Sequence, residues 1–178
     1  MTQDAVDRIV AQWAQERPEL ETAAMAVFGR VFRLSRLVGD EMEAVYARHD
    51  LGRPDFDVLA TLRRSGPPYE LSPGALASSM MLSSGGTTAR LDRLEKAGLV
   101  ERAADPGDRR GVLVRLTTDG TRTADAAVTA GLTRQQELLS HLSGSEQAQL
   151  SELLRRLLAP LEAGTRPHPS VRPRSVEG

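Results

Sequence analysis

The chain has 178 residues, a formal net charge of −1, 40% hydrophobic residues and only 3% aromatic residues. The absence of cysteine excludes disulfides, thiolate metal sites and thiol redox chemistry, and His49, His141 and His168 have no metal-ligand spacing. Without a signal peptide or a membrane-length apolar run, we expect a cytoplasmic protein of one domain plus extensions, with no membrane association.

Two N-terminal segments have the periodicity of helices. Apolar residues recur at helical spacing in residues 4–16, and Pro18 interrupts the pattern. In residues 20–49 apolar residues again recur every three or four positions, and two glycines weaken this pattern without ending it. The sequence therefore predicts a short helix followed by a long one.

Three shorter helices are predicted next. The first begins at residues 53–55 (Arg-Pro-Asp), because proline is tolerated in the first turn of a helix. The second covers roughly residues 73–79 and begins at Ser72, a capping side chain before a first-turn proline. The third runs from about Ser84 to Ala97, and Gly98 ends it in a left-handed conformation. The second and third helices form a helix-turn-helix candidate.

The segment that follows has the pattern of a β-hairpin. Residues 99–103 indicate a strand, and residues 105–108 (Asp-Pro-Gly-Asp) indicate a turn. Residues 112–117 alternate with the period of a half-buried strand. A helix-turn-helix followed at once by a two-stranded ribbon predicts a winged helix-turn-helix, which is a mainly α fold with a small β-wing (α+β).

The C-terminal part returns to helix over residues 118–141 and 145–163, with Ser145 as the cap of the second helix. Six leucines give this last helix a broad apolar face: Leu150, Leu153, Leu154, Leu157, Leu158 and Leu161. So large a face needs a partner, and a two-fold homodimer is the simplest one. The alternative is an intramolecular bundle with residues 20–49. The Pro-, Arg- and Ser-rich residues 164–178 are expected to be disordered.

Residues 82–120, LSSGGTTARLDRLEKAGLVERAADPGDRRGVLVRLTTDG, resemble the MarR family of winged-helix regulators. The Asp-x-Arg of Asp108 and Arg110, with Leu116-Thr117 after it, is similar to that family's wing signature. The resemblance covers most of residues 25–162. It implies a homodimer whose interface is formed by the N- and C-terminal helices, and repression through palindromic operators in double-stranded DNA.

The expected organisation has four parts. An extra helix and a dimerisation helix occupy residues 1–49, and the DNA-binding domain occupies residues 50–117. C-terminal dimerisation helices occupy residues 118–163, and residues 164–178 form the tail. Within the DNA-binding domain, the start of the third short helix should enter the major groove.

Hydroxyls and closely approaching backbone amides suit that position, because both reach base edges or phosphates. The residues expected there are Ser83, Ser84, Gly85, Thr87 and Thr88. The alternative for the glycines is a poorly formed helix start. Arg93 is expected to contact phosphate, and a solvated helix face is its alternative.

The wing tip carries the paired arginines. Arg110 should insert into a narrow minor groove, whose concentrated negative potential attracts arginine. Asp108 can orient Arg110 through a charge-assisted hydrogen bond, and Arg109 is expected to hold the DNA backbone. The alternative is that these are solvated charges of a turn.

A second resemblance concerns a ligand. Residues 56–73 and 82–102 are similar to the urate-responsive PecS/HucR branch of the family, whose extra N-terminal helix bears a tryptophan. The resemblance places four residues in a ligand site: Trp13, Asp57, Arg90 and Arg102.

In such a site the two arginines would fork the oxygens of a planar anion, and Asp57 would accept hydrogen bonds from its ring N–H groups. Trp13 would stack on the face of the ring. Because Arg90 belongs to the predicted DNA-reading helix, a ligand that moves it would release DNA. The alternatives are a structural Asp57–Arg90 ion pair, a surface-facing Asp57 and a packing role for Trp13.

No catalytic residue, metal ligand or cofactor is predicted. The glycines at Gly85 and Gly86 lack the lysine and spacing of a phosphate-binding loop, and the serines at Ser83 and Ser84 are not in a Gly-x-Ser-x-Gly elbow. The alternatives to a urate-responsive repressor are a regulator with a different phenolic or anionic ligand, and a winged helix used only for protein contacts.

Overall fold

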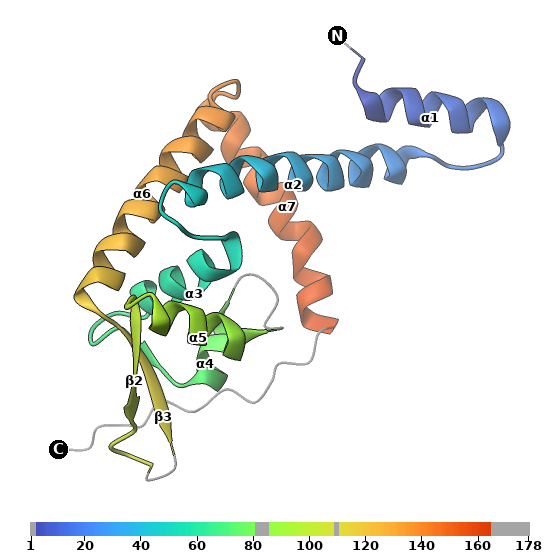
Figure 1. The fold of residues 1–178 in the computed structure, drawn as a ribbon. Coiled ribbons are helices and arrows are strands. Elements are labelled where there is room, and N and C mark those ends of the chain that lie inside the picture. The colour runs from blue at the N-terminus through green and yellow to red at the C-terminus, as the bar shows by residue number, and fades with distance from the viewer. Residues whose placement is uncertain (1–2, 81–85, 109–110, 165–178) are drawn as a thin grey trace. The chain divides into compact units, whose positions relative to one another are not determined.

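The structure, a computed structural model, describes residues 3–80, 86–108 and 111–164. The chain folds into two compact units, Met1–Ala44 and Val45–Gly178. Both units are built mainly of helices, and a small sheet belongs to the second (Figure 1). None of the described helices combines the length and the hydropathy that a bilayer-spanning segment requires. The predicted mainly α fold with a small β-wing is therefore confirmed.

The first unit contains α1 (Ala5–Glu16) and most of α2 (Ala23–Ala47). Both helices lie within their predicted ranges. Asp4 caps α1, because its carboxylate accepts hydrogen bonds from the backbone amides of Val6 at 2.7 Å and Asp7 at 2.9 Å. Asp7 accepts one in return from the amide of Asp4 at 2.9 Å. This reciprocal capping box satisfies amides that a helix start otherwise leaves without partners.

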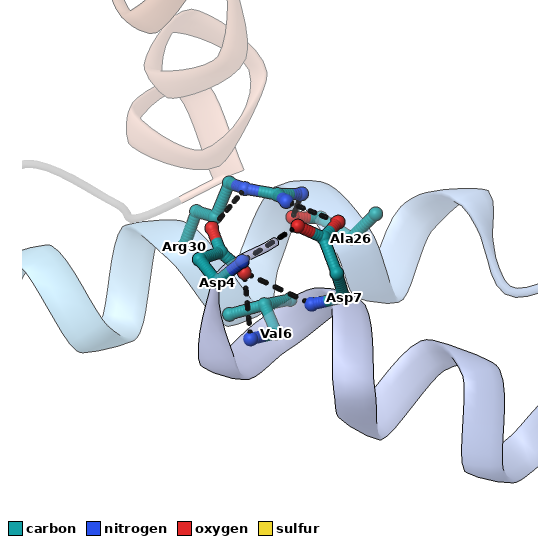
Figure 2. Close-up of polar contacts among 5 residues, drawn as sticks. All are labelled: Asp4, Val6, Asp7, Ala26 and Arg30. Carbon is teal, nitrogen blue, oxygen red and sulfur yellow. Dashed lines mark hydrogen bonds and ion pairs between the residues drawn. The ribbon is translucent and has the colours of Figure 1, made fainter. Parts of the chain in front are cut away.

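The same two aspartates attach the start of α1 to α2 (Figure 2). Arg30 donates from Nε to Asp4 Oδ2 at 2.9 Å and from Nη2 to Asp7 Oδ1 at 2.6 Å. Beneath the charges, Val6 is buried against Gly29, where a Cβ would lie 2.9 Å from Val6 Cγ1. A glycine is thus needed for this approach, and the first turn of α1 is held by both charge and apolar packing.

Acidification is expected to loosen this attachment. The backbone hydrogen bonds of the capping box, followed by those of Arg30, lower the pKa of Asp4 and Asp7 below the ordinary 3.8. A carboxyl whose folded pKa is depressed stabilises the fold above its unfolded pKa, and this stabilisation is lost as pH falls through the folded pKa. The attachment should therefore be complete at neutral pH and weaken below pH 3.8. The fluorescence of Trp13, the only tryptophan, can follow it.

The control for this titration is Arg30→Gln, which removes the ion pairs but leaves the capping box in place. Its acid transition should be smaller than that of the wild type, with part of the fluorescence change already present at neutral pH. An identical titration in the two proteins would show that Arg30 does not hold α1.

The second unit contains five further helices, each of which overlaps its predicted range. They are α3 (Arg53–Arg64), α4 (Pro73–Ser79), α5 (Thr87–Lys96), α6 (Thr118–Leu139) and α7 (Gly144–Gly164). One predicted cap is wrong: Ser143, rather than Ser145, caps α7. Ser143 Oγ accepts from the amide of Glu146 at 3.4 Å and donates to its carboxylate at 2.6 Å. The helix begins two residues earlier than the cap at Ser145 would require.

The sheet has three antiparallel strands in the order β1-β3-β2. The predicted ribbon is formed by β2 (Val100–Ala104) and β3 (Val112–Leu116), with Ala104 opposite Val112 next to the turn. The sequence did not indicate β1 (Glu70–Leu71), which pairs with the other edge of β3. Two residues are too few for periodicity to be recognised.

The core of the second unit lies between α3, α4, α5, α6 and the sheet. Its deeply buried apolar side chains include Val58, Leu59, Leu62, Leu76, Leu91, Leu94, Val100 and Val114, together with Ala124 and Ala127 of α6. The predicted inward positions Leu59, Leu62, Leu91 and Leu94 are among them. Phe56 is only half-buried and stacks on Tyr46, with the ring centroids 3.8 Å apart.

A tight junction joins this core to α6. Thr117 caps α6 by accepting from the amide of Gly120 at 2.9 Å, and its hydroxyl donates to the carbonyl of Gly98 at 2.7 Å. The amide of Thr117 donates to the carbonyl of Leu99 at 3.1 Å. Gly120 lies so close to Leu99 that a Cβ there would fall 1.8 Å from the Leu99 carbonyl oxygen. The orientation of α6 on the winged module therefore depends on this glycine.

Candidate DNA-binding interface and ligand site

The helix-turn-helix is built by local signals at the ends of α4 and α5. Ser72 caps α4, accepting from the amide of Ala75 at 3.2 Å. The end of α5 has the bond pattern of a Schellman motif: the amide of Gly98 donates to Glu95, and the amide of Leu99 donates to Leu94, each at 2.9 Å. Gly98 has a φ of 72°, so its predicted left-handed conformation is confirmed.

The predicted start of α5 at Ser84 is wrong. Gly86 has a φ of 74° and is the N-cap, so α5 begins at Thr87. A left-handed residue cannot lie inside a right-handed helix, and glycine adopts this conformation without steric cost. Thr87 and Thr88 therefore form the first turn of α5, with Thr87 half-buried and Thr88 exposed.

Five further candidates for the DNA interface fall in segments that the structure does not describe. Ser83, Ser84 and Gly85 precede the described part of α5, and Arg109 and Arg110 fall in the gap of the wing. Their predicted contacts lie outside the described residues and stay predictions.

The described residues on the two sides of that gap are hydrogen-bonded to each other. The amide of Asp105 donates to the carbonyl of Gly111 at 3.0 Å, and the amide of Gly111 donates to Asp108 at 2.8 Å. A Cβ at Gly111 would lie 2.8 Å from that of Asp105, so a larger residue would force these two residues apart. Asp108 itself is exposed.

Ion pairs connect α5 to the elements on either side of it. Arg93 donates to Asp55 on α3 at 2.8 Å. Arg102 on β2 donates to Asp92 at 2.6 Å and also to Glu95. Hydrogen bonding to Asp92 is the largest cause that raises the pKa of Arg102. Two of the predicted binding arginines are thus engaged with carboxylates in the free protein.

A charged row that sequence reasoning missed crosses the sheet. Arg115 on the central strand lies between Glu70 of β1 and Glu101 of β2, which are its partners in the strand register. Its Nε lies 3.3 Å from Glu70 Oε2 and 3.6 Å from Glu101 Oε1. The sequence offered one sign of this row, which is Arg115 within the alternating pattern of β3. Its pairing with Glu70 could not be predicted, because Glu70 lies on β1, the strand that the sequence did not indicate.

The predicted ligand residues occupy different elements. Asp57 is on α3 and is only 6% exposed, which excludes the alternative of a surface-facing side chain. Burial is the largest cause that raises the pKa of the neighbouring Tyr46, and the charge of Asp57 adds to the shift while Arg53 opposes it. Arg90 is half-buried on α5, and Trp13 on α1 is 41% exposed.

The fold and this site define the class of protein: a winged helix-turn-helix with long helices before and after the module. Comparison with known proteins agrees. The model of the MarR family matches residues 49–111. The HTH-type transcriptional regulator PecS of Dickeya dadantii is 38% identical over 152 residues, which are 85% of this chain and 92% of PecS. The chain therefore belongs to the MarR family.

Solved structures share the architecture. A mutant MarR from Escherichia coli, complexed with operator DNA, is 28% identical with a TM-score of 0.64, covering 82% of this chain and 97% of that one. AbsC, a MarR family transcriptional regulator from Streptomyces coelicolor, has a TM-score of 0.71 over 81% of this chain and 97% of its own. AbsC is only 21% identical, so it shows the fold alone. The family consists of transcriptional regulators, and this chain is not an enzyme.

Proposed function

We propose that the chain is a homodimeric repressor that binds a palindromic operator and is released by a small planar anion such as urate. The observation that carries the DNA-binding part is the succession of α4, α5 and the β2–β3 ribbon within one compact unit. A MarR of the same architecture has been solved on operator DNA. In this proposal residues 50–117 form the DNA-binding module, and the first turn of α5 enters the major groove.

The dimer proposal is supported by where apolar side chains remain exposed. Large apolar side chains are exposed on α1 and α2 at Ile9, Trp13, Met25, Val27, Phe28, Phe32, Leu34 and Leu37, and on α6 and α7 at Leu132, Leu139, Leu153, Leu157, Leu158 and Leu161. Within the described part of the winged module, Val112 is the only large apolar side chain that is exposed. Exposed apolar patches of this kind mark interaction surfaces. In a two-fold dimer the same surface of each subunit forms the interface, so these side chains would be buried against the equivalent side chains of a second copy.

The DNA contacts can be tested with Arg110→Ala. If Arg110 enters the minor groove, this variant should bind a duplex with two half-sites one helical turn apart with about 1–3 kcal/mol less free energy. Its dimer mass and helix content should not change. The measurement is a mobility-shift titration at matched salt, because phosphate contacts make affinity steeply salt-dependent. Binding equal to that of the wild type would exclude this role of the wing.

The effector proposal rests on the resemblance to the PecS/HucR branch and on the chemistry of four side chains. Asp57 and Arg90 lie on α3 and α5, two helices that contact each other, and Arg102 contacts the far end of α5. An anion drawn to these arginines would therefore act on the DNA-reading helix directly. By linkage, a ligand that weakens DNA binding must itself be bound more weakly when DNA is present.

Urate titrated into the protein–operator complex is expected to release the DNA. Asp57→Asn should abolish the response, because the buried carboxylate is the proposed acceptor for the ring N–H groups. Asp119→Asn is the matched control, since this exposed carboxylate lies on α6 and pairs with Arg122 of the same helix. Full DNA binding at a large excess of urate would exclude urate as the effector, and a panel of planar aromatic anions would then identify the ligand.

A further inference from the structure

We propose that Arg102 is a positioning residue for DNA reading, which joins the wing to α5 and partly neutralises two carboxylates that α5 would otherwise present to DNA with their full negative charge. The inference rests on the proposed DNA-binding function and adds to it a role for Arg102 in the absence of any effector. The charges belong to Asp92 and Glu95, both on α5.

The contact between Arg102 and α5 has three hydrogen bonds. The guanidinium donates to Asp92 Oδ1 at 2.6 Å and, through its other terminal nitrogen, to Glu95 Oε2. The backbone amide of Arg102 donates to Glu95 Oε1 at 3.3 Å. The Arg102 side chain is 30% exposed, while that of Asp92 is 59% exposed. The carboxylates therefore remain accessible to solvent on one side. On the other side the Arg102 guanidinium, which comes from β2, contacts them.

These carboxylates are close enough to bound DNA to matter. With a rise of about 1.5 Å per residue, Asp92 lies about 8 Å and Glu95 about 12 Å along the helix from Thr87 in the first turn. The Debye length at physiological salt is about 8 Å, so salt screens Asp92 from nearby phosphates only in part and screens Glu95 more strongly. Without a counter-charge, both would repel the DNA backbone.

The position of the acids in α5 adds to the cost of leaving them without a counter-charge. Glu95 lies in the last turn of the helix, where the macrodipole disfavours negative charge and favours a cation, and Asp92 lies directly before that turn. Arg93 on the same helix is engaged with Asp55 of α3, so it does not supply the counter-charge. Arg102 supplies it and also fixes the end of α5 to β2. An anion that attracted Arg102 would uncover both carboxylates and so weaken DNA binding.

The test distinguishes neutralisation of the Asp92 and Glu95 carboxylates by Arg102 from a direct contact between Arg102 and DNA. Arg102→Ala should weaken binding to the operator duplex roughly tenfold at low salt, and the loss should shrink as salt is raised. Adding Asp92→Asn and Glu95→Gln to this variant should restore the affinity to within about threefold of the wild type, because the charges that needed masking are gone. Arg122→Ala, which removes an equally charged but exposed side chain of α6, should bind like the wild type.

A second variant covers the case in which Arg102→Ala fails to fold. Arg102→Gln keeps a hydrogen-bond donor near Asp92 but has no charge, so it should lose about as much affinity as the alanine variant. A triple variant that stays as weak as Arg102→Ala, or a glutamine variant that binds fully, overturns the inference. A folded wild type that binds no operator overturns the proposed function before any variant is compared.

Discussion

Replacing Leu157 and Leu161 with glutamate is expected to convert the proposed dimer into a monomer. Both leucines are exposed on α7 of the single chain, Leu161 to 65%. If they meet their copies across a two-fold axis, the double variant would bury four carboxylates in an apolar interface, at a cost of several kcal/mol. The dimer should then be weaker by on the order of a hundredfold or more, and operator affinity should fall with it.

The mass of each variant in solution, from light scattering or sedimentation, is the measurement. Val112→Glu is the matched control, because it places the same charge on an exposed apolar residue of the wing, outside the terminal helices. It should retain the dimer mass. A Leu157→Glu, Leu161→Glu protein that remains a dimer with unchanged helix content would show that α7 is not in the interface.

Gly120→Ala is expected to destabilise the fold by on the order of 2–4 kcal/mol, although helix propensity alone predicts the opposite. Alanine is about 1 kcal/mol more favourable than glycine inside a helix. At this position, however, the added methyl would lie 1.8 Å from the carbonyl oxygen and 2.8 Å from the carbonyl carbon of Leu99. Backbone atoms cannot rotate away as a flexible side chain can, so α6 would have to shift.

Chemical denaturation gives the free energy of unfolding directly. Gly74→Ala is the control, since Gly74 is also in the first turn of a helix but has open space where its Cβ would be. That variant should be as stable as the wild type or slightly more stable. If Gly120→Ala proved equally harmless, the close approach of α6 to Leu99 would be disproved.

Much of the helical framework could be predicted because its signals are local. A capping side chain followed by proline marked the start of α4 at Ser72, and Gly98 marked the end of α5, each within a few residues of the feature it controls. The alternating pattern of residues 112–117 predicted β3 for the same reason. The family motifs lie in the same continuous segment, so the family resemblance was also available from sequence.

The failures concern contacts between different helices and strands. The two residues of β1 form a strand only because the free edge of β3 offers them backbone partners. Arg102 was assigned to a ligand from its resemblance, and nothing local showed that Asp92 and Glu95 already bind it. Asp57 looked compatible with the surface because periodicity does not tell which face of a helix the neighbouring elements cover.

The sequence by itself therefore determined the order of the helices, the winged helix-turn-helix and the family. These depend on backbone preferences and hydrophobic periods that each segment carries within itself. Only the tertiary structure decided which charges are paired, which aspartate is buried and why Gly120 has no room for a side chain. These properties arise when different helices and strands pack together, because packing determines both the distance between charges and their access to water.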